Sequence, residues 1–148
     1  MARNDVLIKA RPADVFEVLT DAEAYGFWVV GAKEIRSKDK RWPRRGSRFH
    51  HTVGVGSATV KDTSEVLDIR QDRRLVLEAR VRPFGTATVE LDLKPANRGK
   101  ATRVIMHEEA RRGPLRRVWN PVFDTAVHVR NVVALRRLKR LAESRVGR

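Results

Sequence analysis

The stretch TATVELDL, residues 86–93, decides the fold class of this chain because its side chains alternate in polarity without interruption. Four apolar side chains share one side of an extended strand: Ala87, Val89, Leu91 and Leu93. Threonine and carboxylate side chains share the other side. A strand of this kind belongs to a sheet that buries one face, so another part of the chain must cover that face.

Comparable segments lie on both sides of this strand, and short turns of glycine, proline and polar residues separate them. The expected strands are residues 6–11, 28–36, 48–55, 59–69, 75–81, 85–93 and 102–110. The last five are joined by connections too short for crossover helices, which favours antiparallel neighbours. Two short helices are expected between the first two strands. One begins at Pro12, and the other begins near Asp21 and ends near Tyr25.

The cover for the sheet is a long amphipathic helix that follows the strands and runs almost to the C-terminus. Its inward stripe is spaced at three and four residues and consists of Phe123, Val127, Asn131, Ala134, Leu138 and Leu141. The charged residues of this segment lie away from the stripe, and they are Arg136, Arg137, Lys139 and Arg140. A smaller apolar strip of Val122, Val129 and Val133 is expected to pack on the two short helices. If it is exposed, it marks a dimer contact.

The elements therefore follow the order strand, two short helices, six strands and a long helix, which is an α+β architecture. The length of 148 residues suits a single domain spanning residues 1–148. A curved sheet wrapped around one helix often leaves a hollow between them. The order of elements thus predicts a protein that encloses a ligand. The protein is expected to be a monomer or, if the apolar strip on the helix is a contact, a homodimer.

Composition excludes several classes of protein. The chain has no cysteine, which excludes disulfides, thiolate metal sites and a cysteine nucleophile. No apolar run approaches the length of a membrane-spanning helix, and the first residues lack the apolar core of a signal peptide, so we expect a cytoplasmic protein. The motifs of serine hydrolases, phosphate loops and dinucleotide sites are absent, and no cofactor is expected.

The net charge of +14 is unevenly spread. Residues 111–148 carry 11 Lys and Arg against 2 Asp and Glu, so this segment contributes +9 of the total. A second basic cluster lies within residues 33–48. Such patches attract phosphates, nucleic acid or anionic lipid headgroups, although each is also compatible with a solvated basic surface.

Alternation also predicts which polar residues face the interior. If Val104 and Met106 face inward, so does Glu108, and a buried carboxylate must be paired or neutral. Residues two apart in a strand share a face, so His51 should face inward with Phe49, and Asp62 should face inward with Val60. The alternative is a bulge that reverses the register, or pairing of these groups with arginines such as Arg80 and Arg103 at the rim.

Adjacent histidines at 50 and 51 suggest a metal site that could recruit His107 and Glu109. The two histidines point to opposite faces of a strand, so no metal site is expected. Catalysis would have to be acid/base chemistry by His51, Asp62 or Glu108 on a bound ketone. On the long helix, His128 and Asn131 could both reach the hollow, and Asn131 is equally suited to a hydrogen bond with backbone.

Short motifs over nearly the whole chain resemble one superfamily. They are RPADVF at 11–16 with LTD at 19–21, Tyr25 and Trp28, Trp42-Pro43 with Gly46, Asp62 and Val66, RPFG at 82–85, TRV at 102–104 with Glu108, and RNV at 130–132 with LRRLK at 135–139. This is the START-like, birch-pollen-allergen-like superfamily, or SRPBCC group, which includes polyketide cyclases and lipid carriers. The resemblance implies a helix-grip fold, with a seven-stranded antiparallel sheet around the C-terminal helix and a cavity for apolar molecules.

Three functions are compatible with these features. The first is binding of a small hydrophobic or aromatic molecule, such as a lipid, polyketide or isoprenoid-like compound, in the internal cavity. The second is a polyketide cyclase/dehydratase-like enzyme that uses the same pocket, and the third is an RNA- or ribosome-contacting protein that uses the basic helix. The expected ligand-lining residues are Trp28, Phe49, His51, Asp62, Val89, Leu91, Met106, Glu108, Phe123, Val127 and Asn131.

Overall fold

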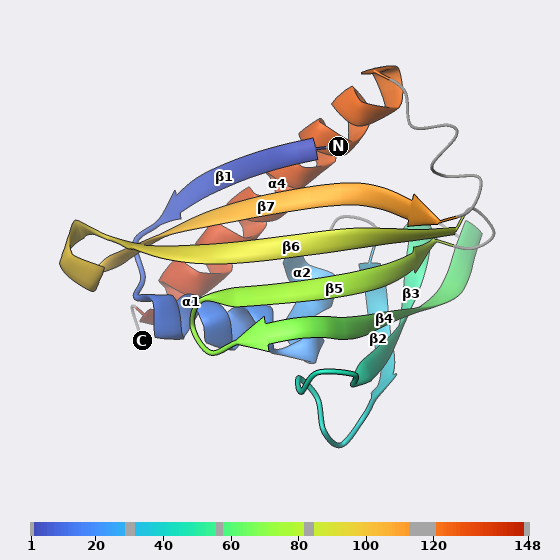
Figure 1. Ribbon diagram of the computed structural model, residues 1–148, viewed down its shortest axis with the longest axis horizontal. Coiled ribbons are helices and arrows are strands. Elements are labelled where there is room, and N and C mark those ends of the chain that lie inside the picture. Colours follow the sequence, from blue (N-terminus) through green and yellow to red (C-terminus); the bar gives the residue numbers. More distant parts are fainter. Residues whose placement is uncertain (1, 29–31, 56–57, 82–84, 113–120, 147–148) are drawn as a thin grey trace.

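The computed structural model describes residues 2–28, 32–55, 58–81, 85–112 and 121–146 (Figure 1). The helices of this part of the chain are α1 Pro12–Leu19, η1 Ala22–Ala24, α2 Tyr25–Trp28, η2 Asn97–Gly99 and α4 Pro121–Val146. Its strands are β1 Ala2–Ile8, β2 Ala32–Lys38, β3 Arg48–Val55, β4 Ala58–Arg70, β5 Arg74–Val81, β6 Gly85–Ala96 and β7 Ala101–Arg112. None of these helices combines the length and apolar character needed to cross a membrane.

The strands form one curved antiparallel sheet, as the alternation pattern predicted. Its order is β1-β7-β6-β5-β4-β3-β2, so consecutive strands from β2 to β7 are neighbours and β1 returns to pair with β7. The helices α1, α2 and α4 all lie on one face of this sheet (Figure 1). This is the predicted helix-grip arrangement, with β1 and β2 as the edges of the sheet.

The core lies between that face and the helices. On β6, Ala87, Leu91 and Leu93 are buried, which confirms the alternation that defined the fold class. On α4, Leu138 is fully buried, and the other described members of the predicted inward stripe are buried or partly buried. Burial of a leucine side chain contributes roughly 1.5–3 kcal/mol, so the matched faces of β6 and α4 account for much of the stability of this fold.

Two of the predicted strand starts are wrong, and the first strand also ends at Ile8 rather than at residue 11. The first strand begins at Ala2 rather than at residue 6, because Asn4 is an inward-facing polar residue that breaks the apolar alternation. Trp28 ends α2 instead of opening a strand. Its ring meets Tyr25, three residues earlier, at a centroid distance of 5.7 Å, so helical spacing is what places Trp28 in the core.

The apolar strip on the back of α4 is also not where we expected it. Val122, Val129 and Val133 have exposed fractions of 81%, 57% and 36%, and they do not pack on the short helices. The reason is rotational: α1 and α2 pack against the side of α4 that already faces the core, which leaves this strip pointing outward. A dimer contact at this strip stays a prediction.

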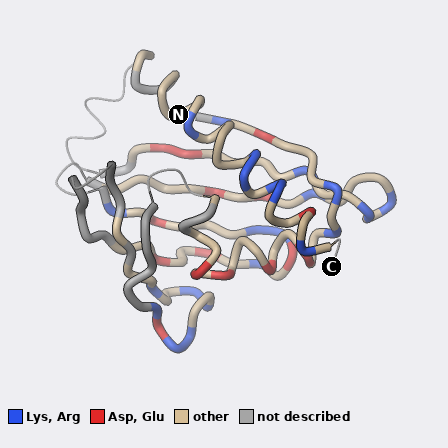
Figure 2. The backbone as a smooth tube through the Cα atoms, turned by 180° about the vertical axis from the view of Figure 1, so that it is seen from behind, with Lys and Arg blue, Asp and Glu red and all other residues tan. Residues whose placement is uncertain are grey.

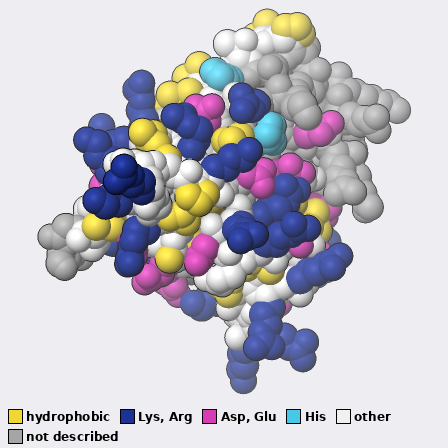
Figure 3. Space-filling view, turned by 60° about the vertical axis from the view of Figure 1, so that its left-hand side comes forward, with side chains coloured by type: hydrophobic (Ala, Val, Ile, Leu, Met, Phe, Trp, Pro, Cys, Tyr) yellow, Lys and Arg dark blue, Asp and Glu magenta, His cyan; other side chains and the backbone are white. Residues whose placement is uncertain are grey.

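Among the exposed cationic groups of this framework, two coincide with the basic segments of the sequence. Figure 2 shows Lys and Arg along the C-terminal half of α4, where Arg136, Arg137 and Arg140 are exposed and have no ion-pair partner among the described residues. Lys139, by contrast, pairs with Glu143 at 3.0 Å. The second group projects from the turn between β2 and β3, at the lower end of the face shown in Figure 3.

Two carboxylates hold the C-terminal end of α4 against the rest of the fold. Glu143 accepts the backbone N–H of Lys9 at 2.8 Å, and Asp21 accepts a bond from Arg145 at 2.9 Å. Burial raises the pKa of each carboxyl, but the bonds from Lys9 and Lys139 to Glu143, and from Arg145 to Asp21, outweigh it. The net pKa of both groups therefore lies below the ordinary value.

These depressed pKa values predict a loss of stability in acid. Because folding favours the ionised form, the stabilisation is complete above the ordinary values of 3.8 for Asp21 and 4.5 for Glu143, and it disappears as the pH falls through the lower folded values. We expect Glu143→Gln to cost about 1 kcal/mol at pH 7 and progressively less below pH ~4. Urea unfolding of the wild type and of Glu143→Gln across this pH range measures the difference in their free energies of unfolding. A difference that does not change with pH would contradict the link between stability and ionisation of Glu143.

Candidate functional site

Glu108 is the one buried carboxylate among the residues that the structure describes. It lies on β7 with Met106 on the same side, and its exposed fraction is 7%. The prediction that Glu108 faces inward together with Val104 and Met106 is therefore confirmed. A carboxylate at this depth is stable only with hydrogen-bonding or ionic partners, so its neighbours define the chemistry of the site.

Two adjacent residues of α4 supply those partners. Arg130 Nη2 lies 2.7 Å from Oε1 and 2.8 Å from Oε2 of Glu108, and Asn131 Nδ2 donates to Oε2 at 2.9 Å. The Arg130 side chain is 42% exposed, whereas the Glu108 side chain is 9% exposed. The ion pair thus joins the sheet to the helix at the border between the interior and solvent.

The arginine that holds Glu108 differs from those suggested by the sequence. Arg80 is exposed, and Arg103 instead contacts Asp5 at 3.3 Å on the β1 side of the sheet. Arg130 was missed because strand parity carries no information about which turn of α4 lies over Glu108. The hydrogen bond that Asn131 makes is also different, since it goes to a side chain rather than to backbone.

Asn131 retains one polar atom without a partner. The residue is 1% exposed, and its Oδ1 has no hydrogen-bond donor among the described residues. Buried amide oxygens nearly always accept a hydrogen bond, so an acceptor without a described donor marks this position of α4 as a candidate contact. Trp28 has the complementary property: its ring is buried, and its indole N–H has no acceptor among the same residues.

His128 does not face the interior, contrary to expectation. It is an exposed residue of α4 whose Nδ1 lies 3.1 Å from Asn4 Nδ2, and its carbonyl oxygen accepts from the same amide at 3.3 Å. Asn4 is 6% exposed, and its Oδ1 is a further buried acceptor without a described donor. Sequence reasoning missed Asn4 because it began the first strand too late.

An aromatic cluster stands at the β3 side of the interior. Phe49 is fully buried and meets Tyr25 at a centroid distance of 4.8 Å and Trp42 at 4.6 Å. Tyr25 in turn meets Trp28 edge to face. Two of the expected ligand-lining residues, Trp28 and Phe49, therefore belong to one connected group of rings.

The other expected residues divide into two groups. Leu91, Met106 and Val127 are buried and Val89 is partly buried, so they share the interior with Glu108. The side chains of His51, Asp62 and Phe123 lie outside the described residues. The backbone nevertheless pairs His51 with Asp62 as direct cross-strand neighbours of β3 and β4.

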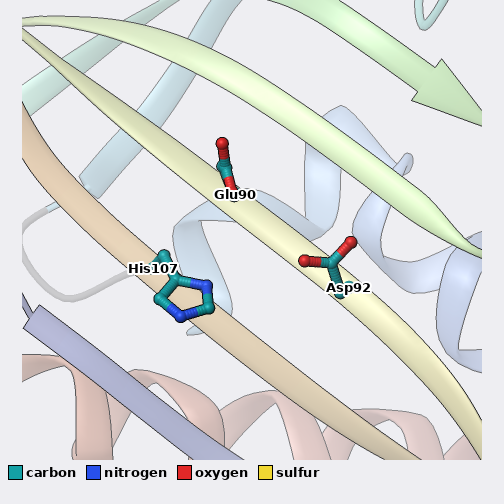
Figure 4. A group of neighbouring side chains, drawn as sticks. All are labelled: Glu90, Asp92 and His107. Atoms are coloured by element: carbon teal, nitrogen blue, oxygen red, sulfur yellow. The ribbon is translucent and has the colours of Figure 1, made fainter.

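A second group of titratable side chains lies on the opposite face of the sheet. Ligand atoms of Glu90, Asp92 and His107 come within 4.8 Å of one another (Figure 4). Arg74 already reaches both carboxylates, at 3.4 Å from Glu90 and 3.0 Å from Asp92. Its guanidinium supplies the positive charge that a cation would bring, so these contacts form an ion-pair network across β5 and β6.

The histidines suspected of binding metal do not come together. His50 on β3 contacts the hydroxyl of Thr63 at 3.0 Å. His107 lies on β7, and three strands separate β7 from β3 in the sheet order. The sheet topology therefore keeps the pair at 50 and 51 away from His107 and Glu109.

Comparisons with known proteins agree with this architecture. A family model described as polyketide cyclase / dehydrase and lipid transport matches residues 2–143. A Staphylococcus aureus protein of unknown function has a similar structure, with a TM-score of 0.75, 12% identity, and coverage of 99% of this chain and 96% of that one. A Nitrosomonas europaea protein is also similar in structure, with a TM-score of 0.74 and 16% identity. The match covers 99% of this chain and 97% of that one.

One further similar structure carries a description of its context. DynU16, from the dynemicin biosynthetic locus, has a TM-score of 0.71 and 17% identity, and the match covers 96% of this chain and 46% of that one. No curated protein matches the sequence significantly. At these identities, the similar structures establish the fold alone.

Proposed function

Because the chain belongs to the polyketide cyclase / dehydrase and lipid transport family, we propose that it binds a small hydrophobic or aromatic molecule between the sheet and α4. The observation that carries the proposal is the Oδ1 of Asn131, a buried acceptor that has no hydrogen-bond donor among the described residues. Ligand sites typically combine apolar walls with a few oriented polar groups.

The contacts around Asn131 suggest how the ligand is oriented. Glu108 accepts from Asn131 Nδ2, which leaves the amide oxygen as the acceptor for a hydroxyl or N–H of the ligand. Leu91, Met106 and Val127 supply apolar surface for the body of the molecule. We therefore favour a ligand with one hydrogen-bond donor on a largely apolar skeleton, which includes lipid alcohols and phenolic polyketides.

Binding is favoured over catalysis because both carboxylate oxygens of Glu108 already accept hydrogen bonds. Both of its oxygens are held by Arg130, and one also accepts from Asn131, so no free oxygen is placed to donate a proton. The cyclase alternative depends instead on His51 and Asp62, which are backbone neighbours on β3 and β4. A pH-dependent dehydration or cyclisation activity that disappears in His51→Ala would favour that alternative.

Titration with N-phenyl-1-naphthylamine tests the binding proposal. This probe is neutral, so the positive charge of the protein does not attract it, and it carries one N–H donor on an apolar body. We expect saturable fluorescence enhancement with one site per chain. Absence of saturable binding, together with absence of any small molecule copurifying in native mass spectrometry, would overturn the proposal.

Glu108→Gln should weaken this binding. The substitution removes the charge that pairs with Arg130 and leaves Asn131 Nδ2 with a weaker, neutral acceptor, so the Asn131 oxygen is held less firmly toward the ligand. We expect the dissociation constant to rise roughly tenfold, within the range for loss of a hydrogen bond in an apolar site. Glu143→Gln is the matched control, since the same change at the far end of α4 should leave probe binding unchanged. Equal affinities for all three proteins would contradict the assigned role of Glu108.

A further inference from the structure

The turn between β2 and β3, residues 39–47, concentrates positive charge at the edge of the sheet. It contains Lys40, Arg41, Arg44 and Arg45 against the single acid Asp39, a formal charge of +3 in nine residues. All four cationic residues are exposed, and none of them has an ion-pair partner within the described part of the chain. Figure 3 shows Lys and Arg side chains projecting at this end of the molecule.

The pairing of charges just outside the turn is different. Lys38 contacts Glu23 at 3.3 Å, and Arg48 contacts Glu65 at 2.6 Å, so the cations that flank the turn are compensated. Asp39 accepts the backbone N–H of Arg48 at 2.9 Å, which holds its carboxylate at the base of the turn. The turn cations are therefore left without compensation while their neighbours are paired.

The turn is attached firmly to the fold. The indole of Trp42 donates to the carbonyl oxygen of Thr20 at 2.8 Å, and its ring packs against Phe49. Gly46 donates to the Val66 carbonyl oxygen at 2.8 Å. Its φ of +84° lies in the region that favours glycine, so the backbone conformation here depends on this residue. The cations thus stand on a fixed backbone rather than on a free loop.

An open, shallow surface hollow of about 480 Å³ lies against the turn. Its lining consists of Asp39, Lys40, Arg41, Arg45, Gly46 and Ser47. Three cationic side chains thus border a space that is large enough for a phosphate or pyrophosphate group. Guanidinium groups bind phosphate oxygens in paired hydrogen bonds, and a lysine ammonium adds a compact charge.

We propose that this basic turn is a phosphate-binding site, in which Lys40, Arg41 and Arg45 contact the phosphate. Three cations against the one carboxylate of Asp39 give the lining a formal charge of +2. A doubly charged phosphate matches this charge better than a carboxylate does, because it carries more charge and more acceptor oxygens. The phosphate belongs either to a free phosphorylated molecule or to a lipid headgroup. The site is independent of the interior site at Glu108, so either proposal can fail without the other.

Inorganic pyrophosphate is the probe for the first test. In amide NMR spectra of the ¹⁵N-labelled protein, we expect saturable shifts centred on the N–H groups of residues 39–47. The variant Lys40→Gln/Arg41→Gln/Arg45→Gln should bind roughly tenfold to a hundredfold more weakly, since it lacks three charge-assisted contacts.

A matched variant controls for net charge. Arg136→Gln/Arg137→Gln/Arg140→Gln removes the same three charges from exposed, unpaired positions on α4. It should retain the affinity for pyrophosphate and the pattern of shifts. Equal loss of binding in both variants, or shifts spread over α4 as well, would show a general attraction to a basic protein and overturn the site.

Vesicles distinguish the two sources of phosphate. We would compare flotation with phosphatidylcholine vesicles that contain or lack phosphatidic acid, at physiological salt. Binding that requires phosphatidic acid, is lost in the turn variant and is retained in the α4 variant identifies a lipid headgroup. Pyrophosphate binding without vesicle binding identifies a free phosphorylated molecule. Failure of both probes to bind at physiological salt would overturn the proposal.

Discussion

Arg130→Met is expected to lower the free energy of unfolding by about 2 kcal/mol, because it leaves the carboxylate of Glu108 buried without its ion-pair partner. Methionine keeps the apolar stem of the arginine, so packing against β7 changes little. The effect lies below the range for a fully buried pair because the guanidinium side of this contact is open to solvent. Urea unfolding monitored by circular dichroism measures it.

Two further variants separate the loss of the ion pair from loss of the arginine itself. Glu108→Gln/Arg130→Met removes both charges and keeps an acceptor for the Asn131 amide, so its stability should recover to within about 1 kcal/mol of the wild type. Arg136→Met makes the same substitution at an exposed position and should cost less than about 0.5 kcal/mol. If the double variant is no more stable than Arg130→Met, an uncompensated charge is not the cause.

Val127→Trp is expected to weaken binding of N-phenyl-1-naphthylamine by roughly tenfold to a hundredfold. Val127 is buried on the face of α4 that also presents Asn131. An indole at this position would occupy the space proposed for the ligand. A change of even one methylene in an apolar pocket is worth roughly 1–3 kcal/mol of binding free energy, which is about that factor in affinity. The affected quantity is the dissociation constant in the fluorescence titration.

Val129→Trp is the matched control for this prediction. It places the same side chain two residues away on the same helix, at a position that is 57% exposed and points outward. Binding of the probe should be unchanged there. If both variants bind as the wild type does, the probe does not enter the interior beside Val127. If both lose binding, the outward face of α4 takes part.

Much of the framework could be predicted because it depends on local periodicity. Alternation along β6 and β7 placed Leu91, Met106 and Glu108 on the inward face, since successive side chains of a strand point to opposite sides. The three- to four-residue spacing on α4 likewise placed Val127 and Asn131 toward the sheet. Both patterns repeat within a few residues, so neither requires knowledge of the partner element.

The errors arose where local periodicity is interrupted. Asn4 is buried because its side chain contacts His128 on α4, which is far away in the sequence. Local alternation therefore predicts a start of the first strand that is too late. Trp28 opens the strand predicted over residues 28–36, but its packing on Tyr25, three residues earlier, belongs to a helix. In each case, a contact between side chains outweighed the propensity of the segment.

The sequence by itself determined that a long amphipathic helix covers the sheet, and the alternation along β7 predicted the inward face of Glu108. It did not determine that Arg130 and Asn131 would meet that carboxylate, or that the Asn131 oxygen would be left without a partner. Those facts depend on the rotation and axial position of α4 over β7. Packing among many side chains of the core sets both quantities, and no stretch of local sequence encodes them.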